Sequence, residues 1–248
     1  MKYKYKLPGF IFLWVFSVIQ IKAITPEEII KAVDKNAEFK TQSFGITMKI
    51  EKGARTLIKK IEGYGMTNGR KSFMKFINPE DDGVKYLKIE KELWIYFPDA
   101  DDIMKISGHM LRQGMMGSDI SYEDMMESGE WEKKYSIRLL PEETIENIEC
   151  YVVELKAKVS DVAYEKQIMA VDKKNLVPLK VDMYSAGGRL IKKITFHDFI
   201  NISGRITAQK VIIKDTRKKD SLTTMEFAYI KFNEKLPPKV FTKEFLRR

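Results

Sequence analysis

The chain has 248 residues, with 44 Lys and Arg against 35 Asp and Glu, a net charge of +9. Four of these lysines precede residue 24, where there is no acidic residue, so residues 24–248 carry only +5 (40 basic minus 35 acidic). This small excess, spread along the chain, argues against a nucleic-acid partner, whose binding surface concentrates positive charge. The single cysteine, Cys150, excludes an intramolecular disulfide and a cysteine-rich metal site, so the hydrophobic core must hold the fold together.

The first 23 residues have the parts of a secretory signal peptide. Three lysines within residues 1–6 form a basic head, an apolar run starts at Phe10, and the small residue Ala23 ends it. The apolar run is shorter than the ~20 residues of a membrane span. We therefore predict cleavage near Ala23 and export to the periplasm; an uncleaved anchor in the inner membrane is the alternative. Residues 24–248 contain no linker-like stretch and are predicted to form a single domain.

A helix is predicted at the start of this domain. Thr25 is suited to cap it, Pro26 to occupy its first position, and Glu28 to complete a capping box. Apolar residues then recur at helical spacing as far as Ala37, which gives the helix one apolar face. Such a helix must pack on another apolar surface.

From Phe44 onward the apolar residues mostly follow the two-residue period of β-strands. Turn-forming sequences such as Asn68-Gly69 and Ser185-Ala-Gly-Gly188 separate the segments. Many short strands at regular spacing predict a mainly β (α+β) fold with one large, curled antiparallel sheet. The expected strands cover residues 44–51, 57–64, 71–77, 84–89, 93–97, 103–106, 135–140, 151–157, 164–171, 177–184, 190–196, 206–214 and 222–232.

The strand Leu93-Trp-Ile-Tyr-Phe97 is apolar at every position. A strand in an antiparallel sheet with one solvated face alternates between apolar and polar residues, so this strand is expected to be covered on both faces. Either a helix or a bound ligand could provide the second cover.

A methionine-rich segment follows this strand. Six of the thirteen Met lie between Met104 and Met126, and Gly108, Gly114 and Gly117 interrupt the segment. Methionine is common at surfaces that accept varied apolar partners, and glycine makes a segment pliable. We interpret the segment as a mobile lid over an apolar cavity; the alternative is that these side chains fill gaps beneath a long loop.

Motifs for catalysis are missing from the sequence. It contains no G-x-S-x-G, H-E-x-x-H, C-x-x-C, phosphate-binding loop or dinucleotide-binding fingerprint. The two histidines, His109 and His197, are far apart in the sequence. We therefore expect a protein that is not an enzyme and has no catalytic residue, no metal site and no cofactor.

Several strings resemble the family of outer-membrane lipoprotein-sorting proteins similar to LolA. They are Trp94-Ile-Tyr-Phe-Pro98, Met104-Lys-Ile-Ser107, Met116-Gly-Ser-Asp-Ile-Ser-Tyr-Glu-Asp124 and, at the end, Leu236-Pro-Pro-Lys-Val-Phe-Thr-Lys-Glu-Phe-Leu246. The resemblance implies a half-open β-barrel with helices and a lid on its concave side. It also implies a carrier that holds acyl chains in the hollow while crossing the periplasm.

The function expected from the sequence is a periplasmic carrier that moves acyl chains of a lipid or lipoprotein between membranes. Its expected partners are an inner-membrane transporter, an outer-membrane acceptor and, transiently, the membrane itself. An envelope-stress sensor on the same fold and a lipid hydrolase are the alternatives. The residues expected to line the cavity and the lid are Phe44, Ile46, Met48, Phe73, Leu93, Trp94, Ile95, Tyr96, Phe97, Met104, Met110, Leu111, Met115, Met116, Tyr122, Met125 and Met126.

Overall fold

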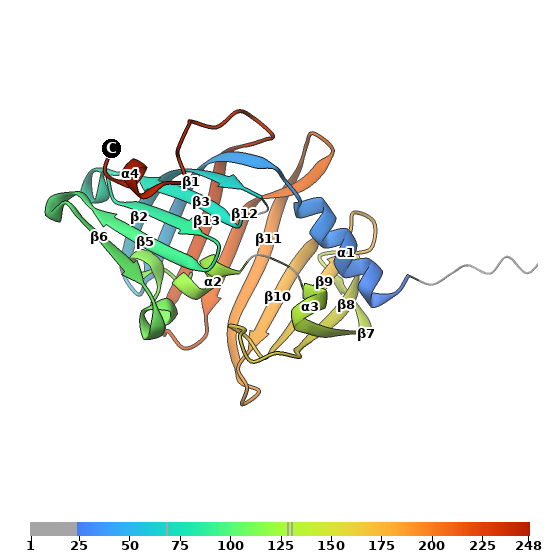
Figure 1. Ribbon diagram of the computed structural model, residues 1–248. Helices are drawn as coiled ribbons and strands as arrows, with labels where there is room; N and C mark the ends of the chain where they lie inside the picture. Colours follow the sequence, from blue (N-terminus) through green and yellow to red (C-terminus); the bar gives the residue numbers. More distant parts are fainter. Residues whose placement is uncertain (1–23, 68, 128, 130) are drawn as a thin grey trace, which may run out of the picture.

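The computed structural model describes residues 24–248 except 68, 128 and 130, so the predicted signal peptide lies outside the described residues. Thirteen antiparallel strands form one sheet in the order β6-β5-β4-β3-β2-β1-β13-β12-β11-β10-β9-β8-β7. Strands β6 and β7 each pair on one side only, so the curled sheet stays open between them (Figure 1). The fold is the half-open β-barrel that the sequence predicted.

Most strands begin and end within about three residues of the predicted positions, but those predicted at 135–140 and 190–196 continue to residues 145 and 202. They are β1 (Thr41–Lys52), β2 (Arg55–Met66), β3 (Lys71–Phe76), β4 (Lys85–Ile89), β5 (Glu92–Phe97), β6 (Asp102–Ile106), β7 (Tyr135–Ile145), β8 (Ile148–Ala157), β9 (Lys166–Asp172), β10 (Pro178–Tyr184), β11 (Leu190–Ile202), β12 (Arg205–Asp215) and β13 (Ser221–Phe232). Four α-helices accompany them: α1 (Pro26–Ala37), α2 (Tyr122–Met126), α3 (Trp131–Lys134) and α4 (Lys243–Leu246).

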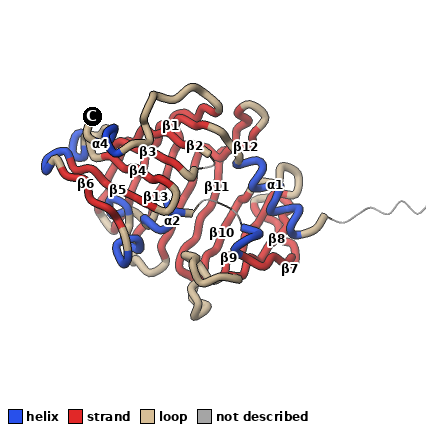
Figure 2. The backbone as a smooth tube through the Cα atoms, viewed as in Figure 1, coloured by secondary structure: helices blue, strands red, loops and turns tan. Residues whose placement is uncertain are grey.

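Helix α1 forms as predicted and packs inside the curl of the sheet. The Thr25 side chain accepts a hydrogen bond from the Glu28 backbone, and the Glu28 side chain accepts one from the Thr25 backbone, which completes the capping box. The apolar face of α1, with Ile29, Ile30 and Val33, packs against side chains of β7 to β10. We call this cluster the helix core. It fills one half of the concave side (Figure 2).

The other half of the concave side is filled by residues 108–126, which we call the plug. The plug contains two short 3-10 helices, Gly108–Arg112 and Met115–Gly117, and ends with α2. It folds back on itself, because the Met115 backbone N–H donates to the Ile120 carbonyl at 2.7 Å. Its apolar side chains pack against those of β1 to β6 in a second cluster, which we call the plug core.

The convex face of β2 to β5 is covered by the C-terminal segment. Val240 and Leu246, both almost fully buried, pack against side chains of β3 to β5 on this face. Helix α4 lies on this outer surface, where Thr242 caps it by accepting from the Phe245 backbone (Figure 1).

Candidate functional site

A row of apolar side chains crosses the concave face of the sheet from the plug core to the helix core. Side chains directly opposite each other in an antiparallel ladder lie on the same face. Met48 of the plug core pairs with Met225, Met225 with Val211, and Val211 with Phe196, which belongs to the helix core. One apolar row therefore crosses β1, β13, β12 and β11 on the inside of the barrel.

The middle of this row is only partly covered, although Met225 packs against the plug core and Phe196 against the helix core. Phe196, Val211 and Met225 are all partly exposed, as is the neighbouring Phe227, which pairs with Ile46. We call these four residues of β11 to β13 the seam. An apolar strip of this kind, left partly open between two packed clusters, is where an acyl chain could lie without first opening either core.

The structure brings fourteen of the seventeen predicted site residues together in the plug core. They are Phe44, Ile46, Met48, Leu93, Ile95, Phe97, Met104, Met110, Leu111, Met115, Met116, Tyr122, Met125 and Met126. It places the remaining three, Phe73, Trp94 and Tyr96, in the cluster under the C-terminal segment on the convex face. Contact of any of the seventeen with a ligand stays a prediction.

Strand β5 owes its apolar sequence to cover on both faces. Leu93 and Ile95 are buried under the plug. Trp94 and Tyr96 point the other way and are buried under the C-terminal segment, with the Lys243 ammonium 4.3 Å from the Trp94 ring centre. The second cover is thus protein, in the form of α4 and the chain around it.

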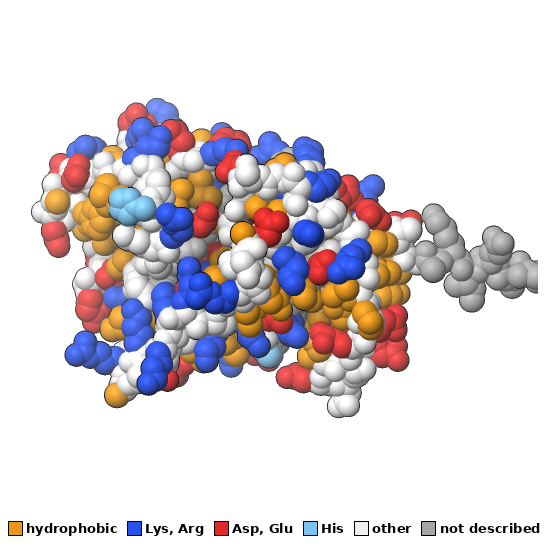
Figure 3. All heavy atoms as spheres, turned by 90° about the horizontal axis from the view of Figure 1, so that it is seen from below, with side chains coloured by type: hydrophobic (Ala, Val, Ile, Leu, Met, Phe, Trp, Pro, Cys, Tyr) orange, Lys and Arg blue, Asp and Glu red, His pale blue; other side chains and the backbone are white. Residues whose placement is uncertain are grey.

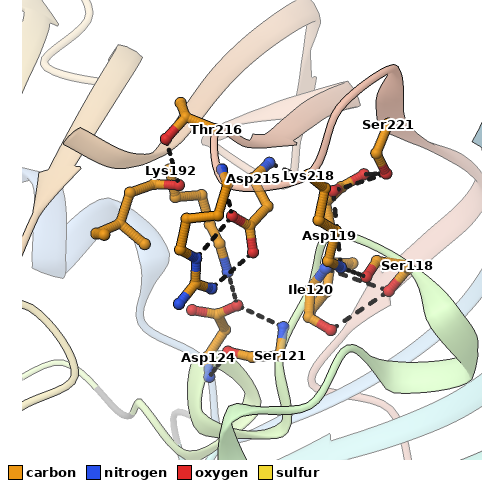
Figure 4. A network of polar contacts seen from close by, with 12 residues as sticks. Ser118, Asp119, Ile120, Ser121, Asp124, Lys192, Asp215, Thr216, Lys218 and Ser221 are labelled. Atoms are coloured by element: carbon orange, nitrogen blue, oxygen red, sulfur yellow. Dashed lines mark hydrogen bonds and ion pairs between the residues drawn. The ribbon is translucent and has the colours of Figure 1, made fainter. Parts of the chain in front are cut away.

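A buried carboxylate fixes the middle of the plug to the sheet (Figure 4). Asp119 is 1 % exposed. It accepts a hydrogen bond from the Ser221 hydroxyl at 2.9 Å. It accepts another from the Thr223 hydroxyl at 2.8 Å, and both hydroxyls belong to the start of β13. The Lys218 ammonium lies 3.8 Å from the carboxylate and also donates to the Ser118 carbonyl. Hydrogen bonds to a buried charge are strong, so this group holds the plug in place.

A second carboxylate fixes the end of the plug. Asp124 accepts from the ammonium of Lys192, which is 1 % exposed, and from the Tyr164 hydroxyl at 2.6 Å. Asp124 also accepts from the Ser121 backbone at 2.6 Å and so completes the capping box at the start of α2. Burial, with Asp124 nearby, raises the pKa of Tyr164, which therefore remains a hydrogen-bond donor. We call the groups around Asp119 and Asp124 the latch.

Solved structures with the same fold come from several bacteria. A DUF1329 family protein from Desulfovibrio piger is 25% identical, with a TM-score of 0.81 over 88% of this chain and 96% of that one. An outer-membrane lipoprotein-sorting protein domain from Vibrio parahaemolyticus is 21% identical (TM-score 0.78, 90% and 100% covered). A LolA superfamily protein from Nitrosomonas europaea is 22% identical (TM-score 0.74, 90% and 100% covered). The last two show the fold alone.

The model of a family of uncharacterized proteins matches residues 68–248, most of the chain. The chain belongs to this family. Its fold is that of the LolA superfamily protein and of the lipoprotein-sorting domain. No curated protein matches it in sequence. The LolA-like resemblance that the sequence strings suggested is therefore confirmed at the level of the fold.

The described residues offer neither a metal site nor a membrane-spanning helix. Within residues 24–248, leaving aside the three undescribed positions, no group of three or more His, Cys, Asp or Glu could hold a metal ion. In the same residues no helix is both long and apolar enough to cross a membrane. His109 is exposed on the plug, whereas His197 lies on β11 with its Nε2 atom 2.8 Å from the Thr195 hydroxyl.

Sequence analysis missed the latch partners. Asp119 and Asp124 stood in the string that carried the family resemblance, but Lys192, Ser221 and Thr223 are about 70 to 100 residues away in the chain. Nothing in their local sequence marks them. A buried carboxylate predicts that donors exist, but not which strand supplies them.

Proposed function

We propose that this LolA-like protein is a periplasmic carrier that holds acyl chains of a lipid or lipoprotein in its hollow and moves them between membranes. The apolar row that continues from the plug core through the seam to the helix core is the observation that carries the proposal. We further propose that the protein performs no catalysis. We also propose that it is exported to the periplasm and that its signal peptide is cleaved near Ala23. An inner-membrane transporter and an outer-membrane acceptor would load and unload it.

The energetics require such a shelter. Each CH₂ exposed to water costs ~0.8 kcal/mol, so one long acyl chain costs roughly 12 kcal/mol in water. The seam offers an apolar surface that is already partly exposed, so the first part of a chain binds there with little rearrangement. Deeper entry displaces the plug, whose methionine side chains can repack around a ligand, and breaks the latch. Loading at a membrane or partner would supply that free energy.

The underside of the molecule suits a brief contact with a membrane. Figure 3 shows Lys and Arg side chains gathered in the middle of this face, with apolar patches beside them. The turn between β12 and β13 lies at this end (Figure 1) and carries Arg217, Lys218 and Lys219. Arg217 and Lys219 are exposed, and a basic surface of this kind is attracted to anionic lipid headgroups.

The test is binding of a fluorescent acyl probe by seam variants. Phe227→Glu places a charge on the seam, and an unpaired charge in an apolar site costs several kcal/mol, so the affinity should fall about a hundredfold or more. Tyr229→Glu is the matched control, because Tyr229 lies two residues away on β13 but outside the seam. Its ring packs against Gly45, the residue opposite it on β1, and Tyr229 is 40% exposed. That variant should bind normally.

Two results would count against the proposal. Wild-type protein that binds no acyl probe, and that yields no co-purifying lipid by mass spectrometry, would exclude the carrier function. Equal losses in the Phe227 and Tyr229 variants would show that binding does not involve the seam.

A further inference from the structure

Four lysines among the described residues are buried, and three of them have partners. Lys59 pairs with Asp81, Lys85 donates to the Leu246 carbonyl at 2.9 Å, and Lys192 pairs with Asp124. The fourth, Lys88, is 2 % exposed, and its ammonium makes no hydrogen bond or ion pair with any described residue. Placing a lysine almost entirely out of water without a partner for its ammonium is costly, so its position points to a partner that arrives from outside.

The position of Lys88 on the sheet shows where that partner would bind. Lys88 lies on β4 and pairs with Leu93 of β5, a fully buried member of the plug core. Opposite residues share a face, so Lys88 belongs to the concave side, inside the barrel. On its other side it pairs with Ser72 of β3.

The charged groups that act on Lys88 belong to its own turn and to the segment between the plug and β7. Burial is the main cause that lowers the pKa of Lys88 to about 8, and Lys134 lowers it further, whereas Glu127 and Glu90 act in the opposite direction. Glu127 is already engaged in an ion pair with Lys134 at 3.0 Å. Lys88 therefore stays mostly protonated at neutral pH, while Glu127 is paired with Lys134.

Glu127 follows α2 of the plug core, and Lys134 ends α3, whose Trp131 packs on the helix core. The lysine thus lies where the two cores meet. It has apolar side chains on both sides, which would accommodate a chain attached to an anionic group.

We propose that Lys88 binds the anionic head, a carboxylate or phosphate, of an acylated ligand whose chain occupies the hollow. The inference rests on the proposed carrier function and specifies the class of its ligand. The ammonium would donate charge-assisted hydrogen bonds to the head, and the surrounding apolar side chains would hold the first part of the chain. Uncharged acyl compounds would bind through the chain alone.

The experiment compares palmitate with hexadecanol, which has the same chain without the charge, on wild type and Lys88→Met. Wild type should prefer palmitate, and the variant should lose about ten- to hundredfold in palmitate affinity, the worth of a hydrogen bond to a charged group. Hexadecanol should bind both proteins equally. Lys91→Met is the matched control, because it removes a positive charge from the same β4–β5 hairpin at a position 89% exposed. That variant should behave as wild type.

The outcomes separate this inference from the carrier function itself. If wild type binds neither compound, the proposed function fails. If both compounds bind and Lys88→Met loses affinity for both or for neither, the carrier function stands but Lys88 does not bind the anionic head of the ligand. Inorganic phosphate, added as a competitor at the palmitate concentration, should not displace the bound ligand from wild type. Displacement as strong as that by palmitate would assign Lys88 to free anions and overturn the inference.

Discussion

Replacing Lys88 with methionine should make the protein more stable, which is unusual for a change at a buried position. The folded state lowers the pKa of Lys88 from 10.5 to about 8, chiefly through burial. Between these values the unfolded chain binds more protons than the folded one, so the wild-type stability rises with pH across this window. Below it, the folded protein carries the full cost of the buried charge.

The size of the effect follows from the same two values. A difference of 10.5 minus about 8, at 1.36 kcal/mol for each pH unit, gives about 3 kcal/mol near pH 7 as an upper estimate. Lys88→Met removes this cost at neutral pH and keeps the side-chain volume similar. Its advantage over wild type should therefore be largest near pH 7 and fall below about 1 kcal/mol at about pH 10.

Urea unfolding of both proteins at a series of pH values measures this difference through the midpoints and slopes. Lys91→Met, at an exposed position, should show no comparable change with pH. A Lys88→Met variant that is less stable than wild type at pH 7, or whose advantage does not change with pH, would mean that the ammonium has a favourable partner in the folded protein. The reasoning behind the anion site would then be wrong.

Three other substitutions test the latch, the outer cover and α1. Asp119→Ala leaves the buried Ser221 and Thr223 hydroxyls without their acceptor and removes the carboxylate beside Lys218, so it should cost about 3–5 kcal/mol in urea unfolding. It should also speed the association of an acyl probe; slower association would contradict the plug's role. Leu246→Ala, at a fully buried position, should cost about 2–5 kcal/mol but leave probe affinity unchanged, because its cluster lies on the convex face. Burial and Glu132 raise the pKa of Asp34 to about 6, so wild-type stability should rise as pH falls from about 6 to 4, and Asp34→Asn should gain about 1–2 kcal/mol at pH 7 and abolish that rise.

Local patterns alone determined most elements of this fold. The capping box of Thr25 and Glu28 marked the start of α1, and the two-residue period marked the strands, because both signals arise within a few residues. The open, curled sheet followed from the number and spacing of the strands together with the family resemblance.

The sequence also indicated that β5 is covered on both faces, and the mobile lid that it suggested for the methionine-rich segment stays a prediction. The sequence could not distinguish helix from ligand as the cover of Trp94 and Tyr96, because α4 lies about 150 residues later in the chain. The pattern alone shows that a face is apolar, whereas the folded chain decides what meets it.

The polar interior was decided only by the tertiary structure. Asp119 accepts a hydrogen bond from Thr223, and Asp124 accepts one from Lys192. Both donors lie on strands that the curl of the sheet brings beneath the plug. Lys88 is unusual because no described side chain pairs with it. In the sequence it is one lysine among many, since the free energy of a buried charge depends on the distant groups that surround it and not on its neighbours along the chain.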